Sequence, residues 1–386
     1  MRHRKEGKTM KNKIAKGLLA AAFAGALAFA LTACGGGTEP APTPEPAPAP
    51  EPAPTPEPAV FVPYEFTDST GRTITISEPI TRVAVSGPTA QQVLLSFAPE
   101  LVVELATPVD AEQAKYLGDF SSLPVVGQLY GGKGTMNKEA LAACQPQILI
   151  DWGEPKGDVK ADMEQLSAEL GIPCVHITAK LETYDEAYKL LGQLLGMTIR
   201  GDEMADYCAE AYAQTTAALA KLDPSKRVSG IMIIEADGKI GVIAKDSYQS
   251  QVFDMCVDNL GVFDNPVAKG TGNATDMEQI ATWNPPFLLC APGDTYTNVM
   301  GDPVWATIDA VQKGMCLEIP GYPYNWMFSQ PSVNQILGMQ WLPRVLYPEL
   351  FTTSAYDVAK EYYKLFYNYD LSEGEYAKIT ANSFTK

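Results

Sequence analysis

The stretch TYDEAYKLLGQLLGMTIRGDEMADYCAEAYAQTTAALAKLDP, Thr183–Pro224, separates two parts of the chain that share one pattern of strands and helices. Thr183 and Glu186 have the spacing of a capping box, and leucines then recur at helical intervals up to Gly196. A second, alanine-rich helix is predicted over roughly 201–222, within the interlobe segment 198–223, and it ends at Asp223-Pro224, where a helix cannot continue. A helix of about 22 residues is roughly 33 Å long, so we expect a rigid strut between two lobes.

Short apolar runs alternate with helical patterns on both sides of this stretch. Before it, strands are predicted over 82–85, 101–105, 147–150 and 173–177, and helices over 90–97, 138–144 and 156–170. After it, strands are predicted over 228–235, 239–243, 287–290 and 315–319, and helices over 249–260 and 277–282. This order predicts an α/β fold, in which two lobes with central, mainly parallel sheets are joined by a single long rigid helix.

The first 34 residues have the order of an export signal. Lysines precede an apolar run from Gly17 to Leu31, and the segment Leu31-Thr32-Ala33-Cys34 matches the lipobox of bacterial lipoproteins. We expect 1–34 to be a lipoprotein signal peptide, with a lipid on Cys34 that anchors the protein at the extracytoplasmic face of the cell membrane. Ordinary secretion, with cleavage after a small residue, is the alternative.

Proline occupies every second position from Pro40 to Pro58, a composition that favours an extended polyproline II helix over a packed core. Residues 35–59 are therefore predicted to be a linker. The remaining chain divides into a first lobe, the interlobe helix, a second lobe and C-terminal helices, predicted over 60–197, 198–223, 224–350 and 351–386.

The charge and cysteine content exclude several classes of protein. A net charge of −17 argues against nucleic acid as a partner and against a broad basic surface for anionic lipid. The seven cysteines show no C-x-x-C pair and no neighbouring histidine at ligand spacing, so we expect no metal cluster. Most lie in apolar runs and are predicted to be buried thiols, although export leaves a disulfide possible. His176 is the only histidine beyond the signal and is predicted to lie in the core.

Several motifs appear in one characteristic order, and in that order the chain resembles the substrate-binding proteins of bacterial ABC importers for iron chelates, haem and cobalamin. The resemblance runs over nearly all of 60–386. Its motifs are Phe66–Ile76, which is expected to form an opening hairpin, and then Arg82–Val85, Val126–Gly127, Met136–Leu141, Pro146–Ile150, Gly171–Pro173, Asp276–Ile280 and Asn284–Pro286.

This resemblance implies a monomer without a cofactor that holds its ligand in the interlobe cleft, moves little at the hinge, and delivers the ligand to a membrane permease and its ATPase. It also implies docking roles for Glu139 and Glu278, one on each lobe, which pair with arginines of the permease. Helix capping is the alternative explanation, because Asn137 is a candidate N-cap before Glu139, and Glu278 has capping-box spacing from Thr275. The two roles are compatible.

Ligand contacts are expected in loops that leave the carboxyl ends of strands, because those loops line the cleft of a two-lobed binder. Aromatic residues in these loops suit a large planar or macrocyclic ligand. The resemblance places Trp152 and Trp326 at positions similar to cleft tryptophans of the cobalamin-binding members. Core packing is the alternative for each aromatic, and it is the expectation for Trp305 and Trp341. The predicted ligand-binding residues are Tyr130, Trp152, Tyr248, Tyr296, Tyr324 and Trp326.

The ligand class follows from charge. Only five arginines lie beyond the signal and none falls in a predicted cleft loop, which disfavours a strongly anionic catecholate complex. Tyr322 and the other loop tyrosines keep a tyrosinate haem site open. A corrinoid or a weakly charged ferric siderophore is therefore predicted first, haem second and a catecholate complex last.

Other functional classes are weaker. Gly127, Gly132 and Lys133 come close to a P-loop, but Gly134 stands where the magnesium-binding hydroxyl belongs. An exported α/β hydrolase would need a nucleophile and a base, yet the chain has no Gly-x-Ser-x-Gly elbow and one histidine beyond the signal. A surface adhesin would be expected to carry repeats, which 60–386 lacks. We therefore expect a binding protein and not an enzyme.

Overall fold

The computed structural model describes residues 61–130, 136–236, 238–267, 271–328 and 332–384, all within one unit that begins at Ala59. The predicted signal peptide, Cys34 and the proline-rich linker lie outside the described residues. In the part of the chain that the structure does describe, no helix is both long enough and apolar enough to cross a bilayer.

The first lobe opens with an antiparallel hairpin of β1 (Tyr64–Thr67) and β2 (Thr73–Ile76), as predicted. A parallel sheet follows in the order β3-β4-β5, with bounds Val83–Val85, Ile148–Gly153 and Cys174–Thr178. Its strands are buried, as expected for a parallel sheet covered by helices. The helices of this lobe are α1 (Pro88–Phe97), α2 (Ala111–Leu117), α3 (Lys138–Ala143) and α4 (Val159–Leu170), with a 3-10 turn, η1, over Pro99–Leu101.

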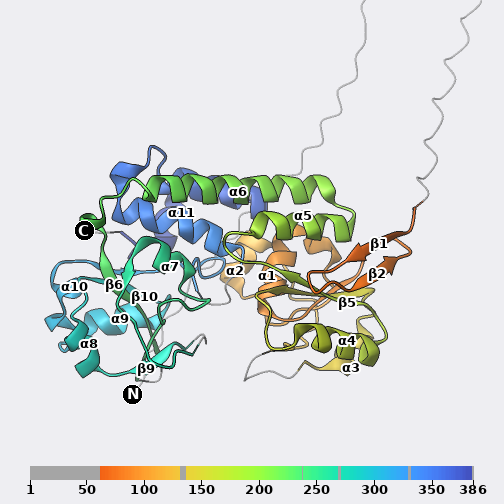
Figure 1. Cartoon of the computed structure of the whole chain (residues 1–386), viewed down its shortest axis with the longest axis horizontal. Coiled ribbons are helices and arrows are strands. Elements are labelled where there is room, and N and C mark those ends of the chain that lie inside the picture. Colours follow the sequence, from red (N-terminus) through yellow and green to blue (C-terminus); the bar gives the residue numbers. More distant parts are fainter. Residues whose placement is uncertain (1–60, 131–135, 237, 268–270, 329–331, 385–386) are drawn as a thin grey trace, which may run out of the picture. The chain divides into compact units, whose positions relative to one another are not determined.

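Two packed helices lead from the first lobe to the second. They are α5 (Tyr184–Leu195) and α6 (Thr198–Leu219), joined at Gly196, which adopts the left-handed conformation that ends α5. Helix α6 runs along one side of both lobes (Figure 1). Its 22 residues correspond to about 33 Å. The predicted strut is therefore present, although it ends four residues before 223 and a 3-10 turn, η2 (Pro224–Lys226), follows.

The second lobe has a larger mixed sheet. Strands β11, β10 and β6 are parallel neighbours, and β7 and β9 extend the sheet with antiparallel pairing, while β8 pairs with β6. The strand bounds are Ser229–Ala236 (β6), Lys239–Val242 (β7), Asp258–Asn259 (β8), Asn273–Thr275 (β9), Phe287–Cys290 (β10) and Cys316–Glu318 (β11). The helices are α7 (Gln251–Cys256), α8 (Met277–Trp283), α9 (Asp294–Gly301), α10 (Asp309–Gln312) and the 3-10 turn η3 (Trp305–Thr307).

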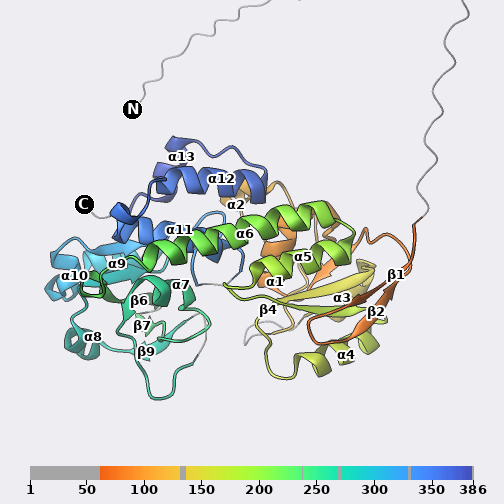
Figure 2. The same cartoon turned by 45° about the horizontal axis from the view of Figure 1, so that its top comes forward.

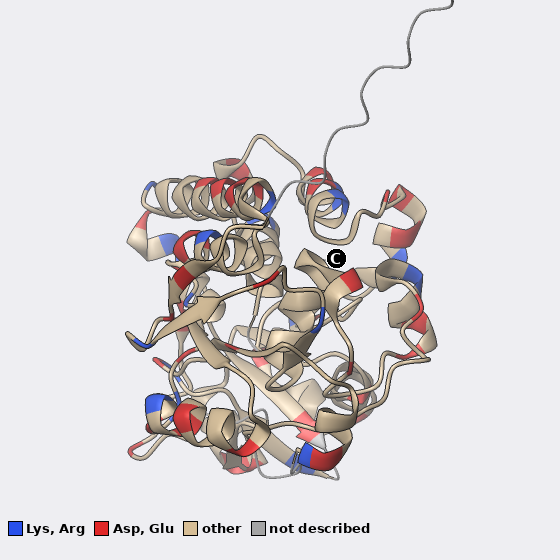
Figure 3. Cartoon of the chain, turned by 90° about the vertical axis from the view of Figure 1, so that its right-hand side faces the viewer, with Lys and Arg blue, Asp and Glu red and all other residues tan. Residues whose placement is uncertain are grey.

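The C-terminal helices return to the first lobe. Helix α11 (Asn334–Leu346) packs on α6 and α7, and η4 (Pro348–Leu350) leads into α12 (Ala355–Tyr367), which packs on α1, and then α13 (Glu373–Ile379). Figure 2 shows α11 beside α6, with α12 and α13 beyond it. One apolar core includes residues of both lobes and these helices, among them Trp341. Trp305 lies in a smaller core of the second lobe, so both tryptophans are buried as predicted. Charged residues lie mainly on helices and loops, and few are on strands (Figure 3).

Three local predictions outside the candidate site were wrong. The predicted strand over 101–105 is a 3-10 turn followed by isolated bridges at Val102 and Leu105, because each pairs with only one residue of a neighbouring segment. The predicted helix over 249–260 stops at Cys256, since the chain then becomes extended and pairs as β8. The capping box at Thr183 does not form, and its hydroxyl instead accepts the backbone N–H of Lys180.

Candidate functional site

The loops that follow β3 and β4 meet at one edge of the first-lobe sheet. The β3 loop, Ser86–Thr89, leads directly into α1, and β4 leads into Gly153 and Glu154. Gly87 is the N-cap of α1 and offers no side-chain cap, while Pro88 occupies the first turn, where its missing N–H costs nothing. The free N–H groups of this turn therefore face the carboxyl edge of the sheet, where ligands of α/β folds bind.

A small hollow of about 30 Å³ lies at this edge, and we call it the α1 pocket. Lys156 lies above the ring of Tyr130, with Nζ 5.4 Å from the ring centroid, and the Tyr130 hydroxyl donates to Asp162 Oδ2 at 2.9 Å. Burial, and then the hydrogen bond to Asp162, raise the pKa of Tyr130, so its hydroxyl remains protonated. The residues that line the α1 pocket are Ser86, Gly87, Pro88, Thr89, Tyr130, Asp151, Trp152 and Lys156.

Asp151 forms the inner wall of the α1 pocket and is bonded on both carboxylate oxygens. The Ser86 hydroxyl donates to Oδ1, and His176 Nδ1 lies 2.6 Å from Oδ2. His176 Nε2 lies 3.2 Å from the Thr178 hydroxyl. Asp151 and His176 are opposite each other on β4 and β5, and only 6% and 1% of their surfaces are exposed. The prediction that His176 is a core residue is confirmed. Its ring also forms a hydrogen bond with Asp151, which lines the α1 pocket.

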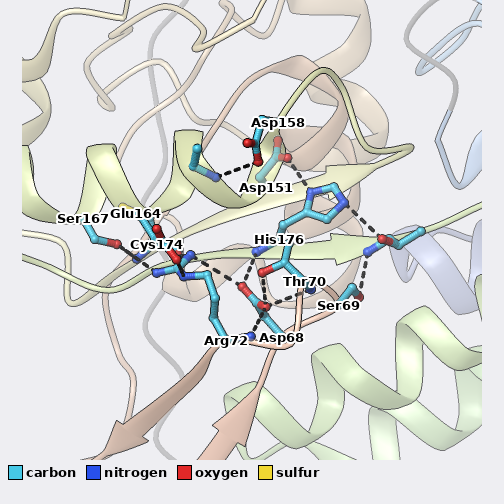
Figure 4. Close-up of polar contacts among 12 residues, drawn as sticks. Asp68, Ser69, Thr70, Arg72, Asp151, Asp158, Glu164, Ser167, Cys174 and His176 are labelled. Carbon is cyan, nitrogen blue, oxygen red and sulfur yellow. Dashed lines mark hydrogen bonds and ion pairs between the residues drawn. The ribbon is translucent and has the colours of Figure 1, made fainter.

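The same network ties the β1–β2 hairpin to the sheet. Asp68, in the turn of the hairpin, accepts the backbone N–H groups of Thr70 and Arg72 and, at 3.3 Å, that of His176. Arg72 bonds the carbonyl of Cys174 and forms an ion pair with Asp68. Figure 4 shows the hairpin turn on one side of His176 and Asp151 on the other. The hairpin therefore braces the strand that carries His176.

A second pocket lies between the lobes, and we call it the acidic pocket. It has a volume of about 410 Å³, and its lining includes Tyr212 of α6 and four carboxylates, Glu154, Glu182, Asp246 and Asp254. None of these carboxylates takes part in an ion pair among the described residues. Hydrogen bonds to Glu154 join the lobes here: Gln251 Nε2 donates to its Oε1 at 3.2 Å, and Tyr248 bonds its backbone. Burial raises the pKa of Tyr248.

Two of the predicted cleft aromatics are buried in the core. Trp326 is fully buried, packs edge-on against Trp341, and donates its Nε1–H to the carbonyl of Tyr322. Tyr324 is buried in the same segment, whose carbonyl accepts from Asn334. Trp326 thus packs against α11, and neither side chain lines the α1 pocket or the acidic pocket.

The other four predicted aromatics lie in different surroundings. Tyr130 and Trp152 both line the α1 pocket, although Trp152 is mostly buried and stacks on Tyr184. Tyr248 lines the acidic pocket. Tyr296, on α9, is half-buried against the second-lobe core and lines neither pocket. The structure thus brings Tyr130, Trp152 and Tyr248 to the interlobe region.

The two predicted docking glutamates are exposed, one on each lobe. Glu139 is in the first turn of α3, where Asn137 caps the helix as predicted. Glu278 is in the first turn of α8, but the cap is Asp276 and not Thr275, so the predicted capping box is wrong. Figure 1 shows α3 and α8 at the lower ends of the two lobes, on the side away from α6.

The site lacks the arrangement of an activated nucleophile. Ser86 donates to Asp151 and not to His176, so the imidazole cannot take the serine proton directly. Among the described residues, no group of three or more His, Cys, Asp or Glu side chains is placed to hold a metal ion. Lys133 and Gly134 of the near P-loop, and Lys269, lie outside the described residues.

Sequence reasoning found the loops of the site but missed several of their contacts. Ligand contacts were expected in loops that leave the carboxyl ends of strands, and the segments Ser86–Thr89 and Asp151–Glu154 are such loops. The link from Ser86 through Asp151 to His176 was not expected, because a histidine inside an apolar strand gives no sign of its cross-strand partner. Gln251 and Asp254 were missed because they lie in a helix and not in a loop after a strand.

Comparisons with known proteins agree with this architecture. The family model of the periplasmic binding proteins matches residues 106–323, which is more than half of the chain. A curated relative, the molybdate-binding protein MolA of Haemophilus influenzae, is 23% identical, over 78% of this chain and 90% of its own length.

Solved structures show the same fold. An ABC transporter solute-binding protein from Sulfurospirillum deleyianum superposes with a TM-score of 0.75 at 22% identity, covering 82% of this chain and 99% of that one. The petrobactin-binding protein YclQ of Bacillus subtilis gives a TM-score of 0.54 at 15% identity, covering 76% and 100%. These relatives are solute-binding proteins, which confirms the prediction of a binder and not an enzyme. The chain belongs to the periplasmic binding protein family.

Proposed function

We propose that this protein is the substrate-binding component of an ABC importer, which captures a solute between its lobes and delivers it to a membrane permease and its ATPase. Family membership and the two lobes beside α6 support this role. The hydrogen bonds from Gln251 and Tyr248 to Glu154 are contacts that a small hinge motion would break and remake.

The proposed ligand is a compact, oxygen-rich anion, and an oxometallate such as molybdate is the leading example. The observation that carries this proposal is the N-terminus of α1, which has no side-chain cap and opens into a pocket beside Lys156. Uncapped N–H groups and the helix dipole favour an anion at such a position, and an ammonium group adds charge-assisted hydrogen bonds. The name of the molybdate-binding relative is consistent with this class.

A corrinoid or ferric chelate is the second candidate, with haem after it. The acidic pocket favours this alternative, because its 410 Å³ can hold part of a larger ligand and it presents Tyr248 and Tyr212. Its carboxylates would suit positively charged groups on that ligand. The burial of Trp326 and Tyr324 removes the broad aromatic wall on which the preference for a corrinoid rested.

The anchor is a lipid on Cys34, with residues 35–59 as a spacer on the extracytoplasmic face. This proposal rests on the lipobox and the proline tract. Cells that express the wild-type chain should retain it in the membrane fraction, whereas Cys34→Ala should leave it unlipidated, as measured by mass spectrometry of the purified protein. A wild-type chain without the mass of acyl groups would contradict the anchor.

Docking is proposed to use Glu139 and Glu278, because both are exposed and lie on separate lobes, on the side away from α6. Separated acidic groups of this kind set the register of a charged interface and speed association.

The ligand class is tested by calorimetric titration of the full chain with sodium molybdate. Lys156→Ala should weaken binding by about tenfold, since it removes one charge-assisted contact. Lys160→Ala is the matched control, because Lys160 is exposed on the adjoining helix and does not line the α1 pocket. Equal losses in both variants would contradict a site at the α1 pocket.

The second candidate is tested by the same titration with cyanocobalamin and with a ferric siderophore. Tight binding of either, together with no heat from molybdate or tungstate, would replace the anion proposal with a chelate held in the acidic pocket. Asp254→Asn would then change affinity and Lys156→Ala would not.

A further inference from the structure

We propose that Asp151 and His176 are positioning residues that set the charge of the α1 pocket, so that binding of an anionic ligand is coupled to uptake of a proton by His176. This inference rests on the proposed function, because it concerns the same pocket. It adds Asp151 and His176 as a pair of residues that affect which ligand charge the pocket prefers.

The pair is connected to the pocket by two hydrogen bonds. His176 bonds one oxygen of Asp151, and the other oxygen accepts from Ser86, which lines the pocket. With a neutral imidazole, the Asp151–His176 pair carries one negative charge at the pocket wall. With a protonated imidazole, the pair is neutral. An anion beside the wall therefore favours the protonated state, and a cation disfavours it.

Protonation needs no rearrangement of the pair. The carboxylate of Asp151 accepts from Nδ1 in both states. The Thr178 hydroxyl, 3.2 Å from Nε2, can donate to a neutral ring or accept from a charged one. The ring thus keeps its position in a buried site while its charge changes, which suits a group that tunes a pocket without moving it.

The charged groups around the pair do not already fix its charge. Asp68 approaches from the hairpin turn, bonds the backbone of His176, and is paired with Arg72. No Lys or Arg within the described residues forms an ion pair with Asp151. The titratable groups near the pair or the pocket also include the buried Glu104, which accepts the N–H of Val85 beside Ser86. Lys180, Glu182 and Glu186 line a hollow together with Thr178. The others are Tyr130, Lys156 and Asp162 in the first lobe and Tyr248 and Glu154 at the lobe contact. The net charge of the Asp151–His176 pair therefore depends on the state of His176, and Glu104→Gln, which cannot ionise, separates any contribution of Glu104 to the pH dependence.

Linkage gives the direction of the effect. If the ligand is anionic, its affinity rises as pH falls through the midpoint of the His176 titration. Ligand binding raises that midpoint in turn, because the coupling free energy is the same in both directions. A midpoint shift of about one unit corresponds to a tenfold change in affinity across the window. For a cationic ligand the signs reverse.

The first experiment needs no ligand. Proton NMR of the protein follows the histidine signals from pH 5 to 9, and His176→Gln identifies the signal of His176. Lys156→Glu puts a carboxylate at the pocket and should raise the midpoint of the His176 titration. The control Lys160→Glu should leave it in place. Failure of His176 to titrate, or equal behaviour of the two variants, would overturn the proposal even if molybdate binds.

The second experiment measures the dissociation constant for sodium molybdate between pH 5.5 and 8.5. The wild-type chain should bind about tenfold more tightly at the acidic end, whereas His176→Gln should bind with a flat profile. Glu65→Gln removes an exposed carboxylate of the same lobe that lines neither the α1 pocket nor the acidic pocket, and it should keep the wild-type slope. A wild-type slope in His176→Gln would overturn the proposal. Absence of molybdate binding at every pH would instead contradict the proposed anionic ligand. The NMR comparison of Lys156→Glu with Lys160→Glu would still test whether charge at the pocket is coupled to protonation of His176.

Discussion

Glu104 is a buried carboxyl with an unusual environment. None of its surface is exposed, Oε1 accepts the backbone N–H of Val85 at 2.7 Å, and Oε2 has no hydrogen-bond partner among the described residues. Burial raises the pKa of Glu104 from its ordinary value of 4.5 to about 7, against the smaller opposing effect of the Val85 hydrogen bond. Val85 directly precedes the loop of the α1 pocket, so this carboxyl supports the site from below.

The raised pKa predicts how stability depends on pH. The protonated folded form contributes stability that is fully present below pH 4.5 and is lost as pH rises through 7, an effect on the order of 3 kcal/mol. Glu104→Gln keeps the hydrogen-bond acceptor and cannot ionise. The difference between its unfolding free energy and that of the wild type should therefore increase, in favour of the variant, from pH 5 to pH 8. Urea denaturation at several pH values measures this gain. The exposed neighbour Glu100→Gln should show none, and a constant difference for Glu104→Gln at all pH values would contradict the effect.

At the scale of elements, α5 and α6 pack closely because glycines face each other. A Cβ on Gly201 would lie 2.8 Å from the Tyr188 carbonyl oxygen and 2.9 Å from Gly192 Cα. Side chains at either position would push the helices apart. The close packing of α5 and α6 therefore depends on Gly192 and Gly201, in addition to the apolar side chains between the two helices.

Gly201→Ala should lower the unfolding free energy by about 1–3 kcal/mol, since backbone atoms cannot yield as side chains can. The control is Gly374→Ala in α13, where an added Cβ meets nothing within 4 Å. That change should be neutral or slightly stabilising, because alanine favours the helix. Thermal melts of both variants compare them directly, and an unaffected Gly201→Ala protein would show that the helices can separate without cost.

The sequence predicted most elements because their signals are local. The hairpin, β4, β5, β10 and α6 follow from alternation, apolar runs and helical spacing. Two errors came from pairing with other segments of the chain. In the 101–105 run, Val102 and Leu105 each form an isolated bridge with a different segment, and the end of the 249–260 pattern becomes β8, which pairs with β6. For the site, the loops were predictable from strand ends, but the burial of Trp326 depends on how its segment packs against Trp341 of the following helix, α11. The Ser86–Asp151–His176 link depends on strand register, which no local pattern encodes.

At the scale of the molecule, the proposed ligand pockets lie between the lobes, and the proposed docking residues lie at the ends of the lobes away from α6. The double variant Glu139→Gln with Glu278→Gln should greatly reduce uptake of ligand in cells while the purified protein keeps its affinity, because both side chains lie away from the two pockets. Glu203→Gln with Glu361→Gln removes two exposed carboxylates from α6 and α12 and should transport normally. Normal uptake in the first variant would contradict the docking role.

The central claim is that an anion binds at the N-terminus of α1. The most direct measurement is diffraction from crystals of the molybdate complex, recorded at the molybdenum absorption edge to locate the metal by its anomalous signal. We expect one strong peak in the α1 pocket, with the molybdate oxygens within hydrogen-bonding distance of the Thr89 N–H and the Lys156 ammonium. A peak in the acidic pocket beside Asp254, or no peak under saturating molybdate, would contradict it.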